Sequence, residues 1–291
     1  MQQYTLRAPC HIYGSGLHTG KPTQVTLLPA PPDTGIWFRI FAAGRQVEFP
    51  ATHESVVRTT MSTCLGRDGV EVCTVEHLLA ALAGLEIDNV VIETDGPEVP
   101  AMDGSAQPFV ARIMEVGRKV QSAPRRYIKV LAPIQVEADD KHAGLYPAVA
   151  PSFSFLIDFD NPGIQTQSLK LFLTPQTFVA QLAKARTFGF VQDLQSLQRK
   201  GLALGAGLEN AVALDAQGAV LNPGGLRYRD EFVRHKILDA IGDLSLAGTP
   251  ILAEYRGIKS GHALNHRLVR RLVEQPDCWE TVSAGAEAQA V

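Results

Sequence analysis

The sequence lacks several features that would narrow its function at once. Its 291 residues contain no stretch near the roughly 20 consecutive apolar residues of a membrane span. Residues 1–7 lack the basic start and the apolar run of a secretory signal. Basic residues are not in excess, because 27 Lys and Arg stand against 30 Asp and Glu and give a formal charge of −3. We therefore expect a cytoplasmic protein that crosses no membrane and binds no nucleic acid.

Cysteine is also scarce. The four cysteines, Cys10, Cys64, Cys73 and Cys278, are scattered and include no C-x-x-C pair. Such spacing in a chain expected to be cytosolic is typical of reduced, mostly buried thiols. The sequence therefore predicts no disulfide framework.

The apolar share of 45% and the charged share of 20% are those of an ordinary folded protein, and 291 residues suffice for two domains. In the first half, residues 24–28 and 89–93 have the pattern of strands. Helical spacing predicts one helix over 75–85, with Thr74 as its N-cap, and another over 108–116.

Residues 121–126 interrupt all periodicity, so we place a boundary there, between domains 1–123 and 124–291. Thr174 and Pro175 have the residue types that begin a helix. The predicted strands and helices of the second half are 127–136, 153–159 and 168–173, then 174–185 and 232–246. Strands followed by helices, twice, favour two α+β domains over a doubly wound parallel sheet.

Three polar residues are spaced one helical turn apart in the helix predicted over 232–246. His235, Asp239 and Asp243 would form one stripe, because residues four apart lie on the same helix face. An imidazole and a carboxylate one turn apart can hold a common metal ion. Taken alone, the stripe is better explained as a solvated helix face with a His–Asp pair, because polar pairs four residues apart are common.

Two other segments carry candidate acid–base groups. Glu76 and His77 begin an otherwise apolar helix, where they could face a metal site or merely complement the helix dipole. His262 follows a glycine in residues 259–266, which we interpret as a loop that presents the imidazole to a cleft. There it could act as acid or base, oriented by Asp243, or it could be an ordinary surface histidine.

Together these segments resemble the UDP-3-O-acyl-N-acetylglucosamine deacetylases of lipid A synthesis. The resemblance runs nearly end to end, and five separated motifs occur in the family's order. These motifs are Thr74-Val75-Glu76-His77-Leu78, Met102-Asp103-Gly104-Ser105, Ala185-Arg186-Thr187-Phe188-Gly189-Phe190, Asp230-Glu231-Phe232-Val233-Arg234-His235-Lys236 and Lys259-Ser260-Gly261-His262-Ala263-Leu264-Asn265. The segment Gly16-Leu17-His18-Thr19-Gly20 belongs to the same resemblance.

The resemblance implies a catalytic centre. Its metal ligands would be His77, His235 and Asp239, with Glu76 as general base and His262 as the acid that protonates the leaving amine. Asp243 would hold the His262 ring, and Lys236 and Thr187 would help to stabilise the oxyanion. The residues implied to contact the sugar, uridine and diphosphate are Lys141, Asp158, Phe159, Phe188 and Phe190.

The family fold consists of two similar α+β domains whose helices are sandwiched between two β-sheets. A βαβ insert in the second domain, about residues 190–214 here, would form a passage for the acyl chain. Departures from the family pattern include Pro223-Gly224 and Gly205-Ala206-Gly207. The loop 61–72 is shorter than in some members, so we transfer no role to Ser62, Thr63 or Cys64.

We therefore expect a zinc-dependent hydrolase (ferrous iron being the alternative metal) that removes the N-acetyl group from UDP-3-O-acyl-N-acetylglucosamine. The expected partner is this small molecule, and the expected oligomeric state is a monomer. Two alternatives remain at this stage: a hydrolase of another acylated sugar nucleotide, and a non-catalytic protein that binds a sugar nucleotide.

Overall fold

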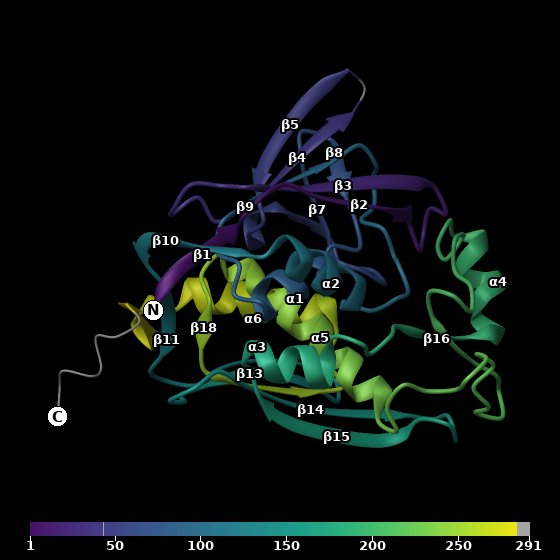
Figure 1. Ribbon diagram of the computed structural model, residues 1–291. Helices are drawn as coiled ribbons and strands as arrows, with labels where there is room; N and C mark the ends of the chain where they lie inside the picture. The colour runs from purple at the N-terminus through teal and green to yellow at the C-terminus, as the bar shows by residue number, and fades with distance from the viewer. Residues whose placement is uncertain (43, 284–291) are drawn as a thin grey trace.

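Helices fill the middle of the molecule, between two layers of β-sheet. The computed structural model describes residues 1–42 and 44–283. Four helices make up most of the central layer: α1 (Glu76–Gly84), α2 (Gln107–Val116), α5 (Glu231–Leu244) and α6 (His262–Glu274). Figure 1 shows strands from the first half of the chain on one side of these helices and strands from the second half on the other. This arrangement is the predicted α+β sandwich.

The two large sheets have the same strand pattern. One has the order β2 (Cys10–Ser15), β3 (Pro22–Pro29), β9 (Val90–Thr94), β4 (Ile36–Ala42), β5 (Arg45–Pro50). The other has the order β12 (Ile134–Ala138), β13 (Lys141–Tyr146), β19 (Glu254–Ile258), β14 (Ser152–Phe159), β15 (Gln165–Phe172). In each sheet the central strand is antiparallel to one neighbour and parallel to the other. The two halves therefore repeat one topology.

Smaller sheets and short helices complete the two halves. Strand β1 (Gln2–Leu6) pairs with β10 (Arg118–Pro124). The two three-stranded sheets are β6 (Val56–Arg58), β7 (Cys64–Arg67), β8 (Val70–Val72), and β18 (Ile251–Leu252), β11 (Arg126–Val130), β20 (Trp279–Ser283). Three 3-10 turns are η1 (His53–Ser55), η3 (Ser245–Ala247) and η4 (Pro276–Cys278).

The helix predicted from residue 174 begins as expected. Thr174 caps α3 (Pro175–Thr177) in a reciprocal capping box, and Pro175 occupies the first helical turn. The helix then widens into the π-helical segment η2 (Phe178–Leu182). Phe178 packs so closely on Gly84 of α1 that a Cβ there would lie 2.3 Å from the Phe178 ring.

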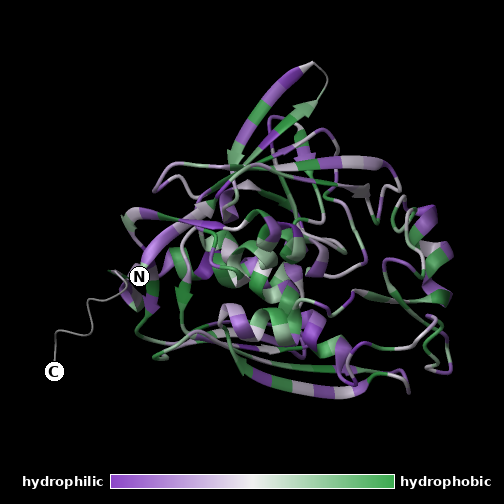
Figure 2. Ribbon diagram, in the orientation of Figure 1, coloured by the Kyte–Doolittle hydropathy of each residue, from purple (hydrophilic) through white to green (hydrophobic). Residues whose placement is uncertain are grey.

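Helices α1 and α5 pack closely against each other. A Cβ at Gly242 would lie 2.1 Å from the backbone oxygen of Glu76, so only glycine allows this approach of the two helices. Hydrophobic residues are frequent in the central helices (Figure 2), and Leu78 of α1 and Leu238 of α5 are fully buried. The close approach brings the polar residues of both helices to one place.

A βαβ unit projects from the second half, at the edge of the molecule in Figure 1. Strand β16 (Phe188–Phe190) is followed by α4 (Val191–Arg199) and then by β17 (Val212–Leu214), which pairs parallel with β16. The segment after α4 contacts the loop 16–20 of the first half. The amides of Ala203, Leu204 and Gly205 donate hydrogen bonds to His18 Nδ1, His18 O and Leu17 O at 3.0–3.2 Å.

Some local predictions are wrong. Residues 121–124 belong to strand β10, because their backbone pairs with β1 at the other end of the first half. Thr74 does not cap α1: its φ is 57° and its hydroxyl donates to the buried carboxylate of Glu98 at 2.9 Å. The predicted strand 127–136 is interrupted, and its two parts belong to different sheets, as β11 and β12.

The prediction of reduced thiols is wrong for one pair of cysteines. Cys64 and Cys73 form a disulfide, whereas Cys10 and Cys278 are free. The antiparallel pairing of β7 with β8 sets Leu65 opposite Val72. Continued by one residue, this register sets Cys64 opposite Cys73. Sequence spacing alone cannot reveal such a pairing.

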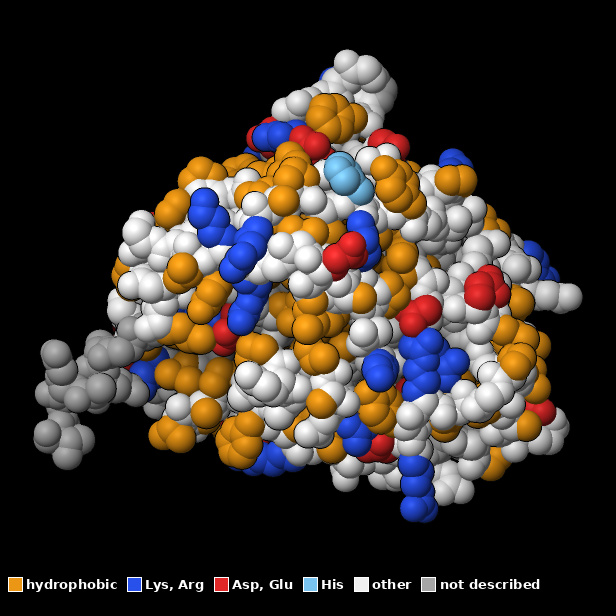
Figure 3. Space-filling view, in the orientation of Figure 1, with side chains coloured by type: hydrophobic (Ala, Val, Ile, Leu, Met, Phe, Trp, Pro, Cys, Tyr) orange, Lys and Arg blue, Asp and Glu red, His pale blue; other side chains and the backbone are white. Residues whose placement is uncertain are grey.

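Nothing in the described helices is both long and apolar enough to cross a membrane. On the face seen in Figure 3, acidic and basic side chains are interspersed among apolar ones.

Candidate active site

Two imidazoles and one carboxylate converge where α1 meets α5. Asp239 Oδ1 lies 3.3 Å from His235 Nε2 and 3.6 Å from His77 Nε2. Their potential ligand atoms all lie within 4.8 Å of one another, and the three residues are buried. These are the three predicted metal ligands, and the fold brings them together from both halves of the chain.

The protonation of this cluster suits a divalent cation. His235 Nδ1 lies 3.1 Å from the carbonyl of Ala185, which can only accept, so Nδ1 carries the hydrogen and Nε2 presents its lone pair to Asp239. Burial lowers the pKa of His235 to about 3, which keeps the ring neutral. Asp239 Oδ1 is buried and has no hydrogen-bond donor among the described residues. Two imidazole nitrogens and one carboxylate oxygen are a common open zinc set.

Glu76 and His262 face each other beside this cluster. Glu76 Oε1 lies 4.0 Å from His262 Nε2; the Glu76 side chain is buried, and that of His262 is 11% exposed. His262 Nδ1 contacts Asp243 Oδ2 at 2.9 Å, as predicted. His262 is the first residue of α6, not part of a loop, and Gly261 precedes the helix as its N-cap. A helix start fixes the ring more firmly than the predicted loop would.

The surrounding charges and burial change the pKa values of both His262 and Glu76. Burial disfavours the charged ring of His262, but the carboxylates of Asp243 and Glu76 outweigh it and raise the pKa of His262 to about 9. Burial also raises the pKa of Glu76, against the opposing effect of His262 and His77. The pair can therefore hold a proton at His262 while Glu76 is available to accept one.

Lys236 lies at the cluster, and Thr187 follows two residues after Ala185, whose carbonyl contacts His235. Burial disfavours the charge of Lys236, but Asp239, whose Oδ2 accepts a hydrogen bond from Lys236 Nζ, outweighs this and raises the pKa of the ammonium. The backbone of Thr187 is held by two hydrogen bonds: its amide donates to Gly104 O and its carbonyl accepts from the amide of Val212. Thr187 is thereby tied to the insert and to the Met102–Ser105 motif.

An aromatic cluster extends from the metal-ligand cluster to the C-terminal end of strand β14. The Phe188 ring centroid lies 6.4 Å from that of His235 and 5.6 Å from that of Phe159. Phe190 also contacts Phe159, at 6.1 Å between centroids. The predicted substrate residues Phe159, Phe188 and Phe190 therefore form one surface that begins at a predicted metal ligand.

The predicted polar residues of the substrate site lie further out. Asp158 Oδ2 accepts from Lys259 Nζ at 2.8 Å, and this contact lowers the pKa of Asp158. Lys259 also reaches Asp140, the neighbour of the exposed Lys141, at 3.0 Å. The geometry thus links Asp158 to Lys259, for which the sequence suggested no role, and leaves Lys141 on the surface.

Comparison with known proteins matches this arrangement to a family. The family model described as UDP-3-O-acyl N-acetylglycosamine deacetylase matches residues 3–274. The chain belongs to this family. A relative in Myxococcus xanthus (strain DK1622), named UDP-3-O-acyl-N-acetylglucosamine deacetylase, is 50% identical over 282 residues, which cover 97% of this chain and 90% of the relative.

Relatives with the same name occur in other bacteria. One from Pseudomonas entomophila (strain L48) is 48% identical over 97% of this chain and 93% of its own length. One from Shewanella halifaxensis (strain HAW-EB4) is 48% identical over 99% of this chain and 95% of its own length. Family membership makes the chain an enzyme of the amide-hydrolase class.

Three polar residues around the cluster were not predicted. Thr63 donates to both Glu76 and Asp243, and Asn265 donates to Asp243 Oδ2 at 2.8 Å. Glu98 accepts hydrogen bonds from His18, Thr19 and Thr74. Asn265 could have been suspected, because it lies three residues after His262 within a motif. Thr63 and Glu98 have no such local signal.

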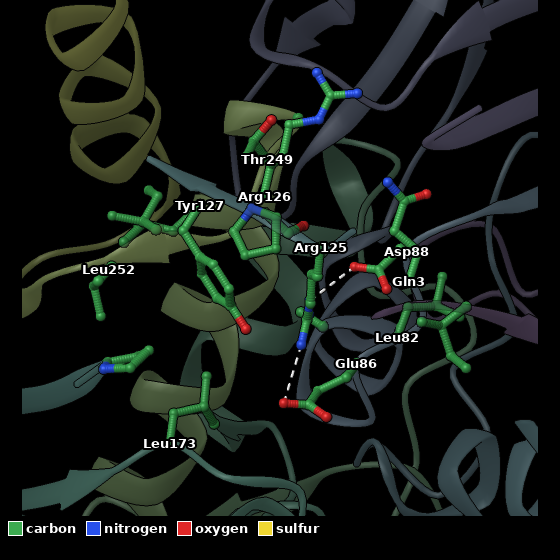
Figure 4. A pocket seen from close by; sticks show the side chains of 18 of the residues that line it. Gln3, Leu82, Glu86, Asp88, Arg125, Arg126, Tyr127, Leu173, Thr249 and Leu252 are labelled. Atoms are coloured by element: carbon green, nitrogen blue, oxygen red, sulfur yellow. Dashed lines mark hydrogen bonds and ion pairs between the residues drawn. The ribbon is translucent and has the colours of Figure 1, made fainter. Parts of the chain in front are cut away.

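A separate cleft of about 730 Å³ lies at the seam between the halves (Figure 4). It is lined by the C-terminal ends of α1 and α5, including Leu82 and Leu244, and contains none of the predicted site residues. In it Arg125 forms ion pairs with Glu86 at 3.0 Å and Asp88 at 2.9 Å. These ion pairs connect the second half of the chain to the first within the cleft.

Proposed function

We propose that this protein removes the N-acetyl group from UDP-3-O-acyl-N-acetylglucosamine and releases acetate, a step of lipid A synthesis. The observation that carries the proposal is the position of the Glu76–His262 pair, 4.0 Å apart, beside the cluster of His77, His235 and Asp239. The names of the relatives supply the substrate.

The proposed chemistry is hydrolysis of an amide. His77, His235 and Asp239 would hold a zinc ion, which supplies Lewis-acid polarisation of the acetyl carbonyl and makes water easier to deprotonate. Ferrous iron suits the same nitrogen and oxygen ligands. Glu76 would accept a proton from the water whose oxygen attacks the carbonyl carbon.

The remaining steps use the other side of the site. Lys236 and Thr187 would donate to the oxyanion that develops on the former carbonyl oxygen. As the carbon–nitrogen bond breaks, His262 would give its Nε2 proton to the departing nitrogen, while Asp243 keeps the ring oriented through Nδ1. The products are acetate and a free amine, and the proton taken by Glu76 balances the one given by His262.

The rest of the substrate would extend along the aromatic surface. We propose that Phe159, Phe188 and Phe190 contact the sugar and nucleotide, that Asp158 binds the uridine and that Lys141 lies near the diphosphate. The acyl chain would follow the insert of about 190–214. The proposed domain division is 1–123 and 124–291, supported by β10 pairing with β1 and β11 pairing with β18 and β20.

We also propose that the protein acts in the cytoplasm as a monomer. Disulfides are rare in reducing compartments, so the redox state of the Cys64–Cys73 pair inside the cell tests this location. Thiol titration of the protein trapped in its host cells, and its sedimentation in solution, test the two statements separately.

The test of function is acetate release from acylated UDP-N-acetylglucosamine by purified protein, before and after removal of metal with a chelator. We expect release that is lost with the metal and regained when zinc is added back. Equal turnover of the analogue without the acyl chain would assign the protein to a different sugar-nucleotide substrate. No release from either substrate would refute the proposed function.

A further inference from the structure

Thr63 is a buried residue between β6 and β7 that uses all three of its polar groups at the site. Its side chain and backbone are 2% exposed. Its amide donates to Glu76 Oε2 at 3.0 Å, and its carbonyl accepts from the amide of Val75 at 3.4 Å. Its hydroxyl donates to Asp243 Oδ1 at 2.7 Å. One residue thus contacts the start of α1 and the C-terminal end of α5.

The hydroxyl of Thr63 completes the surroundings of the Asp243 carboxylate. Oδ2 of Asp243 accepts from Asn265 Nδ2 at 2.8 Å and from His262 Nδ1 at 2.9 Å. Both of these donors come from α6, whereas Thr63 approaches Oδ1 from the first half of the chain. Donors on both oxygens define the plane of the carboxylate, and this plane determines the direction in which it holds the His262 ring.

Thr63 is itself held in place. Its neighbour Cys64 is bonded to Cys73, which lies three residues before Glu76 in the chain. The segment that carries Thr63 is therefore tied to the segment that carries Glu76 by a covalent bond, by one backbone–backbone hydrogen bond with Val75 and by the bond from the Thr63 amide to the Glu76 carboxylate. Because Thr63 is fixed in this way, it can hold Glu76 and Asp243 at a constant distance from each other.

We propose that Thr63 is a positioning residue that sets the geometry between Glu76 and His262. It does so by holding the Glu76 carboxylate through its amide and the Asp243 carboxylate through its hydroxyl. The hydrogen bonds of Thr63 described here go to Glu76, Asp243 and Val75. None of them involves the three proposed metal ligands or the predicted substrate residues. This inference rests on the proposed roles of Glu76 and His262.

The test is Thr63→Val, which removes the hydroxyl but nearly preserves the shape of the side chain. It also leaves the hydrogen bond from the residue 63 amide to the Glu76 carboxylate. We expect kcat for acetate release to fall roughly 10- to 100-fold, the loss usual for a partner that orients a functional group. KM and metal content should stay unchanged, and Thr63→Ser should restore most of kcat. If Thr63→Val fails to fold, Thr63→Ala removes the same hydroxyl without added bulk.

The matched control is Thr94→Val in β9, a buried threonine whose hydroxyl contacts only the backbone of Gly96 in the bonds described. It should leave kcat unchanged. A wild-type kcat in folded Thr63→Val, or a loss that appears equally in Thr94→Val, would overturn the inference. So would a failure of Thr63→Ser to restore activity.

The same assay separates this inference from the proposed function. If His262→Ala and Asp243→Asn lose activity but Thr63→Val does not, only the role of Thr63 is wrong. If His262→Ala keeps full activity, the proposed acid is wrong and Thr63 has nothing to position. In the Asp243→Asn background, Thr63→Val should have little further effect, because residues that act through one another are not additive. A full additional loss there would refute the connection.

Discussion

The two halves of the molecule share a scaffold but differ in what they carry. Both five-stranded sheets have the same order, with a central strand parallel to one neighbour and antiparallel to the other. Helix α1 contributes Glu76 and His77 from its first turn, whereas α5 contributes His235 and Asp239 from its middle. Neither half alone presents the complete cluster. Repetition therefore supplies the framework, and the differences between the repeats supply the chemistry.

The strongest effect should come from breaking this shared cluster from either side. His77→Ala in the first half and His235→Ala in the second should each abolish deacetylation. Both variants should also lose the bound zinc, because each lacks one of the three proposed protein ligands. The measurement is zinc content per protein by elemental analysis, together with activity. Retention of a full equivalent of zinc by either variant would contradict the proposed ligand set.

The acid–base pair also joins the two halves and should produce a bell-shaped pH dependence of kcat/KM. Activity should fall as the pH rises through about 9, because His262 must keep its proton to donate it. It should fall in acid because Glu76 must be ionised to accept a proton, and burial raises the pKa of Glu76 and moves this limb upward.

Variants assign the two limbs. His262→Ala should lose the alkaline limb and Glu76→Ala the acidic limb, each with a rate loss of about 10²- to 10⁴-fold. The pH profiles of both variants, measured beside the wild type, provide the check. An unchanged alkaline limb in His262→Ala would transfer the role of acid to another group, Lys236 first.

Two neighbouring arginines connect the halves in different surroundings. Arg125 is buried between Glu86 and Asp88, so Arg125→Ala should lower the free energy of unfolding by about 3–5 kcal/mol. Arg126 pairs with Asp33 at an exposed position, so Arg126→Ala should cost about 1 kcal/mol or less. Denaturant unfolding compares the two, and equal losses would mean that burial does not decide the contribution.

The Cys64–Cys73 disulfide lies in the first half, and the described residues of the second half contain no disulfide. Reduction, or the double change Cys64→Ser with Cys73→Ser, should lower the free energy of unfolding by about 2–3 kcal/mol, the value for so short a loop. Calorimetry with and without a phosphine reductant measures it. An unchanged melting temperature would indicate that the bond contributes nothing to stability.

Local patterns revealed much of this scaffold. Helical spacing predicted α1 and α5, and alternation predicted β3 and β15, because burial of one face imposes a period on the sequence. Strand β9 was predicted from its β-branched residues. The motifs identified the residues that the fold brings together, including His77, His235 and Asp239. Such features depend on residues close in sequence or on a family pattern.

Features that depend on distant partners could not be predicted. Residues 121–124 became a strand because β1 lies beside them, and Thr74 left its capping role because Glu98 accepts its hydroxyl. The Cys64–Cys73 bond depends on a hairpin register. The contact of Thr63 with Asp243 spans 180 residues, and no local pattern records it.

The division of the cluster between the halves also bears on how the enzyme is made. His77 leaves the ribosome more than 150 residues before His235 and Asp239. The first half has its own sheets and can begin to fold as it emerges. It contains only one of the three proposed ligands, His77, which is too few to retain a zinc ion at this site. If the proposed ligand set holds, metal binding would be a late event in biosynthesis, and a chain truncated before residue 235 would bind no zinc at this site.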